Sequence, residues 1–388
     1  MKASTTRKIR CVAAAGILTL LAACGPAKTA GSSDATAEIS ANVPTMAELY
    51  EGSGSAPPET GPVVAQDKTV WFISCGQKLP DCATMAAASE EAGAALGWNM
   101  RVFDGNLNVN GAFNEGIRAA IAANADAIVI AGMHCEQMIQ SLREAKAAKI
   151  PVIGTDALDC NETGDENGED LITVPMLYSE KAPTMVDWLT SWGSPSAAWL
   201  ANNEPSAKVI TVNSQDPLSN LLMAGFRQGV EQWCSECEIL EELNAPLDGL
   251  APDGLLSQRF QSALTKHSDE ATIAWGSLDY YLGTLGMAKS IENAGLKDKV
   301  HLLGGSGAQA SADLLRAGLL QAIPSARALE WPQWGALDEL NRHFNGEESV
   351  PQGIGVQLAD ETKNMPPAGP YVEQVDFKSA YTTLWAKH

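Results

Sequence analysis

The stretch from Asp126 to Asp156 constrains the fold of this chain more than any other part of it. It begins with a short apolar run, Ala127 to Ala131, which is rich in β-branched residues and typical of a strand buried on both faces. Residues 136–148 repeat apolar side chains at helical spacing, and a second short strand is predicted over 150–154. A strand, a helix and a strand of these lengths form a βαβ unit, which predicts a parallel sheet with a right-handed crossover.

The rest of the chain repeats this pattern. The chain has 388 residues, which is too many for one compact core, so we expect two lobes. Further strands are predicted over 68–74, 98–104, 171–174, 208–213, 238–243, 272–275 and 300–303. Further helices are predicted over 83–96, 110–123, 179–192, 218–233, 255–266 and 281–294. The sequence therefore predicts an α/β fold with two doubly wound parallel-sheet lobes.

The amino terminus has the pattern of an export signal. Basic residues precede an apolar run over 12–21 that is too short to span a bilayer. The run ends in Leu21-Ala22-Ala23-Cys24, which resembles the bacterial lipoprotein signal. The resemblance implies that residues 1–23 are removed and that Cys24 is lipidated; an ordinary secretory signal cut nearby is the alternative.

Residues 24–66 have the composition of a flexible linker, since they are rich in Ala, Ser, Thr, Gly and Pro. A single helical turn is expected over 45–50. No later stretch is long and apolar enough for a transmembrane helix. We therefore expect the folded part to be held at the membrane only through its lipidated amino terminus.

The charge of the chain limits its partners. The formal net charge is −21, and so acidic a surface is a poor partner for nucleic acid, whose phosphates are bound by Lys and Arg. The residues from Asp159 to Asp170 partly match the spacing of a calcium loop, but an Asp stands where the last ligand is usually Glu and no clear helices flank it. We expect a solvated acidic loop there and no metal site, although calcium stays open.

Six of the eight cysteines remain once Cys11 and Cys24 are set aside. Export permits disulfides, and the six fall into three pairs by their proximity, although sequence alone does not prove connectivity. The expected pairs are Cys75 with Cys82, Cys135 with Cys160, and Cys234 with Cys237. For the last pair, free thiols, redox activity and zinc remain alternatives, but a zinc ribbon needs a second CxxC, which the chain lacks.

From about Lys68 onward the chain resembles the type I periplasmic solute-binding proteins, the ribose- and sugar-binding group of ABC importers. The segments that carry the resemblance are KTVWFIS (68–74), ADAIVIAG (125–132), AKIPVIGTD (148–156), AGFRQGV (224–230) and ENAGL (292–296). No single motif is diagnostic, but their order and spacing together are specific.

The resemblance implies two lobes joined by a three-segment hinge, with crossings near Val174, Trp331 and Val356. The expected N-terminal lobe contains residues 67–174 and 331–356. The expected C-terminal lobe contains residues 175–330 and 357–388.

The resemblance also implies that ligand contacts come from strand ends facing the space between the lobes. Carried over one position at a time, the contacts are Gln77, Leu79, Asp81, His134, Asp156, Asn220, Asp279, Ser306, Glu330 and Trp331. Asp156 matches the family's ligand-binding Asp, but Ala157 stands where an Arg usually follows, and Asn220 stands where many sugar binders have Arg. The missing arginines argue against a ribose-like pentose, whereas Asp156 can still accept hydrogen bonds from hydroxyls. Simple packing is the alternative role for Trp331, and a structural role beside a disulfide is the alternative for His134.

These features favour an exported, monomeric substrate-binding lipoprotein on the outer face of the cell membrane or in the periplasm. It would capture a small polar solute, a sugar or related polyol, and deliver it to the permease subunits of an ABC transporter. The alternatives are a ligand sensor that signals to a membrane partner and a binder of an aromatic or amino-acid-like solute. We expect no enzyme and no cofactor, because the sequence holds no G-x-S-x-G, no H-E-x-x-H and no four-ligand Cys/His cluster.

Overall fold

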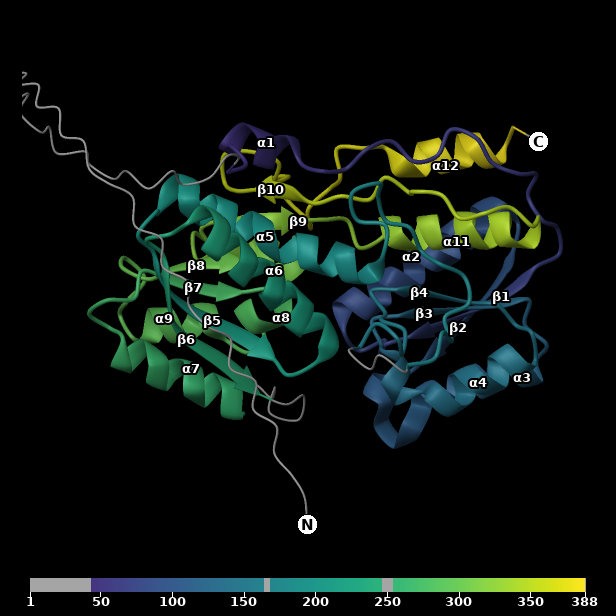
Figure 1. Cartoon of the computed structure of the whole chain (residues 1–388), viewed down its shortest axis with the longest axis horizontal. Coiled ribbons are helices and arrows are strands. Elements are labelled where there is room, and N and C mark those ends of the chain that lie inside the picture. The colour runs from purple at the N-terminus through teal and green to yellow at the C-terminus, as the bar shows by residue number, and fades with distance from the viewer. Residues whose placement is uncertain (1–42, 164–167, 246–253, 388) are drawn as a thin grey trace, which may run out of the picture. The chain divides into compact units, whose positions relative to one another are not determined.

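The computed structural model describes residues 43–163, 168–245 and 254–387. Its N-terminal lobe is built on a parallel sheet in the order β2-β1-β3-β4 (Figure 1). The strands are β1 (Thr69–Ser74), β2 (Asn99–Asp104), β3 (Ala127–Ala131) and β4 (Val152–Thr155). Helices α2 (Pro80–Leu96) and α3 (Ala112–Ala122), the turns η1 (Asn106–Gly111) and η2 (Cys135–Gln137), and helix α4 (Ile139–Ala147) connect them. Every residue of β3 and β4 is buried, as the apolar runs predict.

The C-terminal lobe repeats the arrangement with a parallel sheet in the order β6-β5-β7-β8 (Figure 1). Its strands are β5 (Lys208–Ser214), β6 (Glu238–Ala245), β7 (Ile273–Gly276) and β8 (His301–Gly304). Its helices are α5 (Met185–Asn203), α6 (Pro217–Trp233), α7 (Leu255–Lys266), α8 (Asp279–Leu282), α9 (Met287–Asn293) and α10 (Gln309–Arg316). A small antiparallel pair follows, β9 (Ile323–Ala326) with β10 (Gln357–Ala359). The predicted fold class, α/β with two doubly wound parallel-sheet lobes, is confirmed.

Helix α5 both begins and ends later than predicted. The sequence predicted a helix over 179–192, whereas α5 begins at Met185 and continues through Pro195 to Asn203. Gly193 does not end the helix; it lets α6 approach closely, since a Cβ on Gly193 would lie 2.0 Å from the carbonyl oxygen of Leu222. Burial of this closely packed face offsets the hydrogen bond that a proline inside the helix removes.

The last helices of the chain belong to the N-terminal lobe. Helix α11 (Trp331–Phe344) packs on α2. Helix α12 (Phe377–Trp385) packs there too, with Trp385 stacked on Trp334 at a ring separation of 5.4 Å. This differs from the boundary expected from the sequence, which gave residues 357–388 to the C-terminal lobe.

Residues 43–66, expected to be part of a flexible linker, are bound to the folded body. The predicted helical turn is present as α1 (Met46–Glu51), capped by Thr45. The amide of Ser53 donates to the carbonyl of Val356 at 2.9 Å, and the amide of Ala65 donates to Oδ1 of Asn341, also at 2.9 Å. Because α1 lies on β10 and the segment then enters β1, this stretch passes from one lobe to the other (Figure 1). The return from β10 to α12 is another crossing, so two segments join the lobes beyond the three that were expected.

Some predictions fall outside the described residues. The export signal, Cys24 and residues 24–42 are among them, as are residues 164–167 of the acidic loop. Within the described ranges, no helix has the length and apolarity needed to cross a membrane.

Candidate functional site

Asp156 is the first residue after β4, at the carboxyl end of the N-terminal sheet. Its backbone is left-handed with φ of 49°, a conformation that Asp tolerates better than most residues. Its amide donates to the hydroxyl of Tyr178 at 3.1 Å, and its Oδ2 accepts from Nη2 of Arg327 at 2.8 Å. The carboxylate is buried, and its Oδ1 has no hydrogen-bond partner in the described protein.

Arg327 supplies the arginine that the sequence seemed to lack beside Asp156. It follows β9, on the segment that leads into α11, and its side chain is only 4% exposed. The guanidinium lies over the ring of Trp192, with its carbon 4.3 Å from the ring centroid. Only Nη2 is used by the ion pair; Nε and Nη1 are buried without partners in the described protein. A buried unpaired polar group costs about 1–3 kcal/mol, so these free atoms make the region around Arg327 a candidate binding site.

Asp81 joins this pair from the amino end of α2. Burial and the negative charges of Asp279 and Asp156 raise the pKa of Asp81 to about 6, and the positive charge of Arg327 opposes the shift. No described residue donates a hydrogen bond to its carboxylate. The structure therefore brings together three predicted residues, Asp81, Asp156 and Asp279, with Arg327, which the sequence reasoning missed.

The hydrogen bonding of Asp279 differs from that of Asp81 and Asp156. Its Oδ2 accepts from both the amide and the hydroxyl of Ser306, with the amide at 2.7 Å, and its Oδ1 accepts from the amide of Ser311 at 3.0 Å. Both oxygens are thus committed within the C-terminal lobe. The predicted pair of Asp279 and Ser306 lies together, and its role is to fix the segments that follow β7 and β8.

His134 meets the C-terminal lobe at Asp216. Nε2 of His134 lies 3.8 Å from Oδ1 of Asp216, which caps α6 by accepting from the amide of Ser219 at 3.0 Å. Burial would raise the pKa of Asp216, but the nearby His134 ring and hydrogen bonds from Ser214 and Ser219 hold it below the usual range. This contact spans the two lobes at the edge where their strands end.

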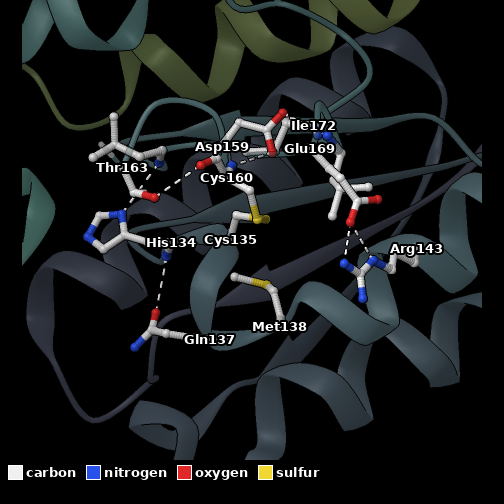
Figure 2. The surroundings of a disulfide bond; sticks show 12 residues. His134, Cys135, Gln137, Met138, Arg143, Asp159, Cys160, Thr163, Glu169 and Ile172 are labelled. Carbon is white, nitrogen blue, oxygen red and sulfur yellow. Dashed lines mark hydrogen bonds and ion pairs between the residues drawn. A yellow bond between two sulfur atoms is a disulfide. The ribbon is translucent and has the colours of Figure 1, made fainter. Parts of the chain in front are cut away.

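A disulfide holds the loop of His134 in place. Cys135 bonds Cys160, so the segment after β3 is tied to the segment after β4 (Figure 2). Next to Cys160, the Asp159 carboxylate accepts from the amides of Leu171 and Ile172 at 2.8 and 2.9 Å. The Asp159 carboxylate therefore closes the loop through backbone bonds.

All three predicted disulfides are confirmed. Their Cα atoms lie 5.6, 5.0 and 5.2 Å apart, which is the separation that a disulfide requires.

The remaining predicted contacts lie elsewhere. Gln77 donates to Oγ of Ser74 at 2.7 Å, Leu79 packs on the core of the N-terminal lobe, and Asn220 is exposed. Glu330 is half-buried at the start of α11. Trp331 is 1% exposed and stacks on Phe377 at 5.2 Å, so it packs between α11 and α12. Within the described ranges, none of these side chains bonds to the cluster around Asp156.

Two further polar residues, Gln333 in the first turn of α11 and Asn213 near the end of β5, have unpaired atoms. Gln333 accepts from the hydroxyl of Thr155 at 3.0 Å, which leaves its Nε2 buried without a partner. Asn213, near the end of β5, leaves its Oδ1 buried without one. The sequence signal for Asn213 was its position at the end of a predicted strand; Gln333, like Arg327, follows no predicted strand.

Comparison with known proteins finds solved structures with the same two-lobed fold. No curated protein matches the chain. Among solved structures, the periplasmic binding protein of the arabinose ABC transporter from Shewanella sp. ANA-3 is 16% identical, with a TM-score of 0.61 over 82% of this chain and 96% of that one. The Caulobacter myo-inositol binding protein is 18% identical, with a TM-score of 0.61 over 78% of this chain and 95% of that one. A solute-binding protein from Agrobacterium vitis, bound to α-D-tagatopyranose, is 21% identical, with a TM-score of 0.60 over 79% of this chain and 100% of that one.

At these identities the solved structures show the fold alone. The family described as "Periplasmic binding protein domain" matches residues 71–336. That match covers more than half of the 388 residues and both sheets, so the chain belongs to the periplasmic binding protein domain family.

Proposed function

We propose that this protein captures a small polyhydroxy solute, a sugar or a related polyol, between its two lobes and delivers it to the permease of an ABC transporter. The observation that carries the proposal is the half-used ion pair of Asp156 and Arg327. Its free atoms are one acceptor, Oδ1 of Asp156, and two donors, Nε and Nη1 of Arg327. A hydroxyl group both donates and accepts, so adjacent hydroxyls satisfy such a mixed set.

The energy available from these groups is sufficient for capture. Hydrogen bonds to charged groups contribute about 1.5–3 kcal/mol each, and about 1.4 kcal/mol changes affinity tenfold. The ion pair is buried and Trp192 covers one face of the guanidinium, so the binding atoms are already oriented. Preorganisation of this kind lowers the entropy lost on binding.

Groups from both lobes take part, which couples binding to closure. Asp156 belongs to the N-terminal lobe, Arg327 lies on the segment between the lobes, and Asn213, whose Oδ1 is unpaired, lies near the end of β5 in the C-terminal lobe. A solute that contacts groups on both sides favours the closed arrangement, and closure presents a distinct surface to a permease.

The family is one of solute-binding proteins, and the solved relatives named above include binders of arabinose, myo-inositol and tagatose. Fold likeness alone does not transfer a ligand. For this chain the sugar or polyol assignment rests on the mixed donor and acceptor set at Asp156 and Arg327.

A thermal-shift screen tests the proposal. The panel contains sugars, polyols, amino acids and aromatic acids. A true ligand at one hundred times its Kd adds about 2.7 kcal/mol of stability, which is readily visible as a rise in Tm. We expect at least one sugar or polyol to raise the Tm; a rise with amino acids or aromatic acids alone would contradict the proposal.

The proposal includes anchoring through Cys24, in a lipoprotein-like signal. Cys24→Ala should release the protein from the membrane fraction or block its processing. Fractionation with an antibody to the mature chain is the measurement. Unchanged membrane retention together with an unchanged mature size would refute lipid anchoring and leave solute capture untouched.

A further inference from the structure

The backbone at Asp156 depends on support from outside its own segment. Its φ of 49° lies in the left-handed region, which is unfavourable for a residue other than glycine. Residues in such conformations persist only where their surroundings hold them. The amide of Asp156 donates to the hydroxyl of Tyr178 at 3.1 Å, and no other described residue accepts from it. Tyr178 therefore holds the backbone from which the Asp156 carboxylate projects.

Tyr178 is itself held in place. It lies on the segment between β4 and α5, where the chain first crosses from one lobe to the other. Its side chain is fully buried, and its ring stacks on Trp188 of α5 with a centroid separation of 4.9 Å. Its carbonyl accepts from the amide of Ile354 at 2.8 Å, on the segment that leads from α11 to β10. The hydroxyl therefore has a fixed position relative to the end of β4.

The ring and the hydroxyl of Tyr178 have separable roles. Stacking on Trp188 needs the ring alone, and a phenylalanine would supply it. A buried hydroxyl costs free energy unless it is hydrogen-bonded. Within the described ranges this hydroxyl accepts from the amide of Asp156, and no residue accepts its own hydrogen. The contact with Asp156 is therefore what a tyrosine provides at this position and a phenylalanine does not.

We propose that Tyr178 is a positioning residue for solute capture, whose hydroxyl keeps Asp156 in the conformation that directs Oδ2 to Arg327 and leaves Oδ1 for the solute. The inference rests on the proposed function, because it assigns a role at the same site. A rotation of the backbone at residue 156 moves both carboxylate oxygens, and hydrogen bonds weaken steeply as their geometry departs from the ideal. Tyr178 acts through Asp156 and does not have to touch the solute.

Tyr381 offers a matched control. It is as deeply buried as Tyr178, and its hydroxyl donates to Oε1 of Gln352 at 2.7 Å. The amide of Gln352 donates to the carbonyl of Leu177, the residue before Tyr178, at 2.9 Å. Removing the Tyr381 hydroxyl therefore loosens the same crossing but leaves the bond to Asp156 in place.

Calorimetry with defined probes tests the proposal. The probes are L-arabinose, D-galactose, D-tagatose and myo-inositol, and affinities are compared for each probe that binds the unaltered protein. Tyr178→Phe should weaken binding at least about tenfold, equivalent to about 1.4 kcal/mol, whereas Tyr381→Phe should weaken it less than about twofold. An unchanged affinity in Tyr178→Phe, or an equal loss in both variants, would overturn the positioning role and leave solute capture supported.

A double-mutant cycle with Asp156→Asn shows whether Tyr178 acts through Asp156. Asn adopts the left-handed backbone readily and lacks the charged oxygens whose direction matters, so this variant should fold and depend less on Tyr178. In the Asp156→Asn background, Tyr178→Phe should weaken binding less than about threefold. Equal losses in the two backgrounds would show that Tyr178 acts independently of Asp156 and would contradict the proposal.

Hydrogen exchange of the Asp156 amide, followed by NMR, needs neither a solute nor a variant. In the unaltered protein this amide should exchange at least about a hundredfold more slowly than an unstructured amide, because it is bonded to the Tyr178 hydroxyl. Exchange at the unstructured rate would refute the proposal even if Tyr178→Phe did not fold. If neither these probes nor the wider screen yields a sugar or polyol that binds, the proposed function fails, and the positioning role fails with it.

Discussion

The loops at the carboxyl ends of the sheet strands are held by different interactions in the two lobes. At the carboxyl ends of the N-terminal strands, two disulfides hold the loops, Cys75–Cys82 after β1 and Cys135–Cys160 between the loops after β3 and β4. At the matching edge of the C-terminal lobe, the Asp279 carboxylate accepts hydrogen bonds from the amides of Ser306 and Ser311. The third disulfide joins the end of α6 to the start of β6, at the opposite edge.

The difference decides which carboxylate is free to bind a solute. Disulfides and the carboxylates of Asp104 and Asp159 fix the N-terminal loops, so Asp156 is not needed for this role and keeps one oxygen unpaired. Asp279 stands at a comparable strand end, but its two oxygens hold its own lobe together. A shared topological position therefore does not give a shared role; the hydrogen-bond partners decide it.

Removing Asp279 should have the largest effect on stability. Asp279→Ala leaves the buried amides of Ser306 and Ser311 and one hydroxyl without their acceptor. At about 1–3 kcal/mol for each unpaired buried group, with partial relaxation, we expect a loss of about 4 kcal/mol. Urea denaturation is the measurement.

The exposed Asp313 on α10 provides the matched control, and Asp313→Ala should cost less than about 0.5 kcal/mol. A loss of similar size in both variants would show that Asp279 is not the group that holds the edge of the C-terminal lobe.

Removing the Cys135–Cys160 disulfide should have the next largest effect. It closes a loop with a sequence separation of 25, for which chain entropy gives about 3.5 kcal/mol. The Cys234–Cys237 disulfide has a separation of 3, for which the same relation gives about 1.5 kcal/mol. Paired Cys→Ser variants, compared by denaturation, should follow this order. A greater loss from the shorter loop would contradict the view that disulfides stabilise the N-terminal edge in particular.

Asp81→Asn should have the smallest effect, with the opposite sign. Burial raises the folded-state pKa of Asp81 to about 6, above its ordinary value of 3.8, so ionised Asp81 opposes folding. Its penalty is absent below a pH of about 4, grows as the pH rises to about 6 and is complete above that value. Asp81→Asn should therefore stabilise by about 1–3 kcal/mol at a pH of about 7.5 and by almost nothing at about 4.

The contribution of Asp81 is the difference in stability between Asp81→Asn and the unaltered protein at each pH. This comparison is needed because burial also raises the pKa of Glu339 and Glu373 to about 7. These two contribute to the pH profile of both proteins and cancel in the difference. A stabilisation that does not change with pH would show that Asp81 is not the source.

The sequence predicted the paired sheets because their signal is local. Ala127–Ala131 is buried at every position, and an uninterrupted apolar run is what such a strand requires. The disulfides were predicted for a related reason, since each pair lies close in sequence or follows adjacent strands. Predicted helix boundaries differ from the structure where a glycine or proline lies inside a helix instead of ending it. Gly193 is an example, since it allows close helix packing within α5.

The missed parts depend on contacts between distant residues. Asp156 and Arg327 are 171 positions apart, and β9, which delivers Arg327, has four residues including a proline. No local periodicity marks such a strand. Trp331 was expected to contact ligand because the family resemblance was carried over to its position. The helix that covers it, α12, was not predicted, and Phe377 of that helix stacks on the indole ring.

Calorimetry on Asp156→Ala, with the solute that the screen identifies, tests most directly whether the pair of Asp156 and Arg327 is the binding site. Asp156→Asn, which keeps the size of the side chain, guards against loss of folding, since the alanine leaves a buried guanidinium unpaired. Asp156→Ala should weaken binding by about tenfold to a thousandfold, because charge-assisted hydrogen bonds contribute about 1.5–3 kcal/mol each. Equal affinity in the folded variant and the unaltered protein would show that Asp156 does not contact the solute and that the site lies elsewhere.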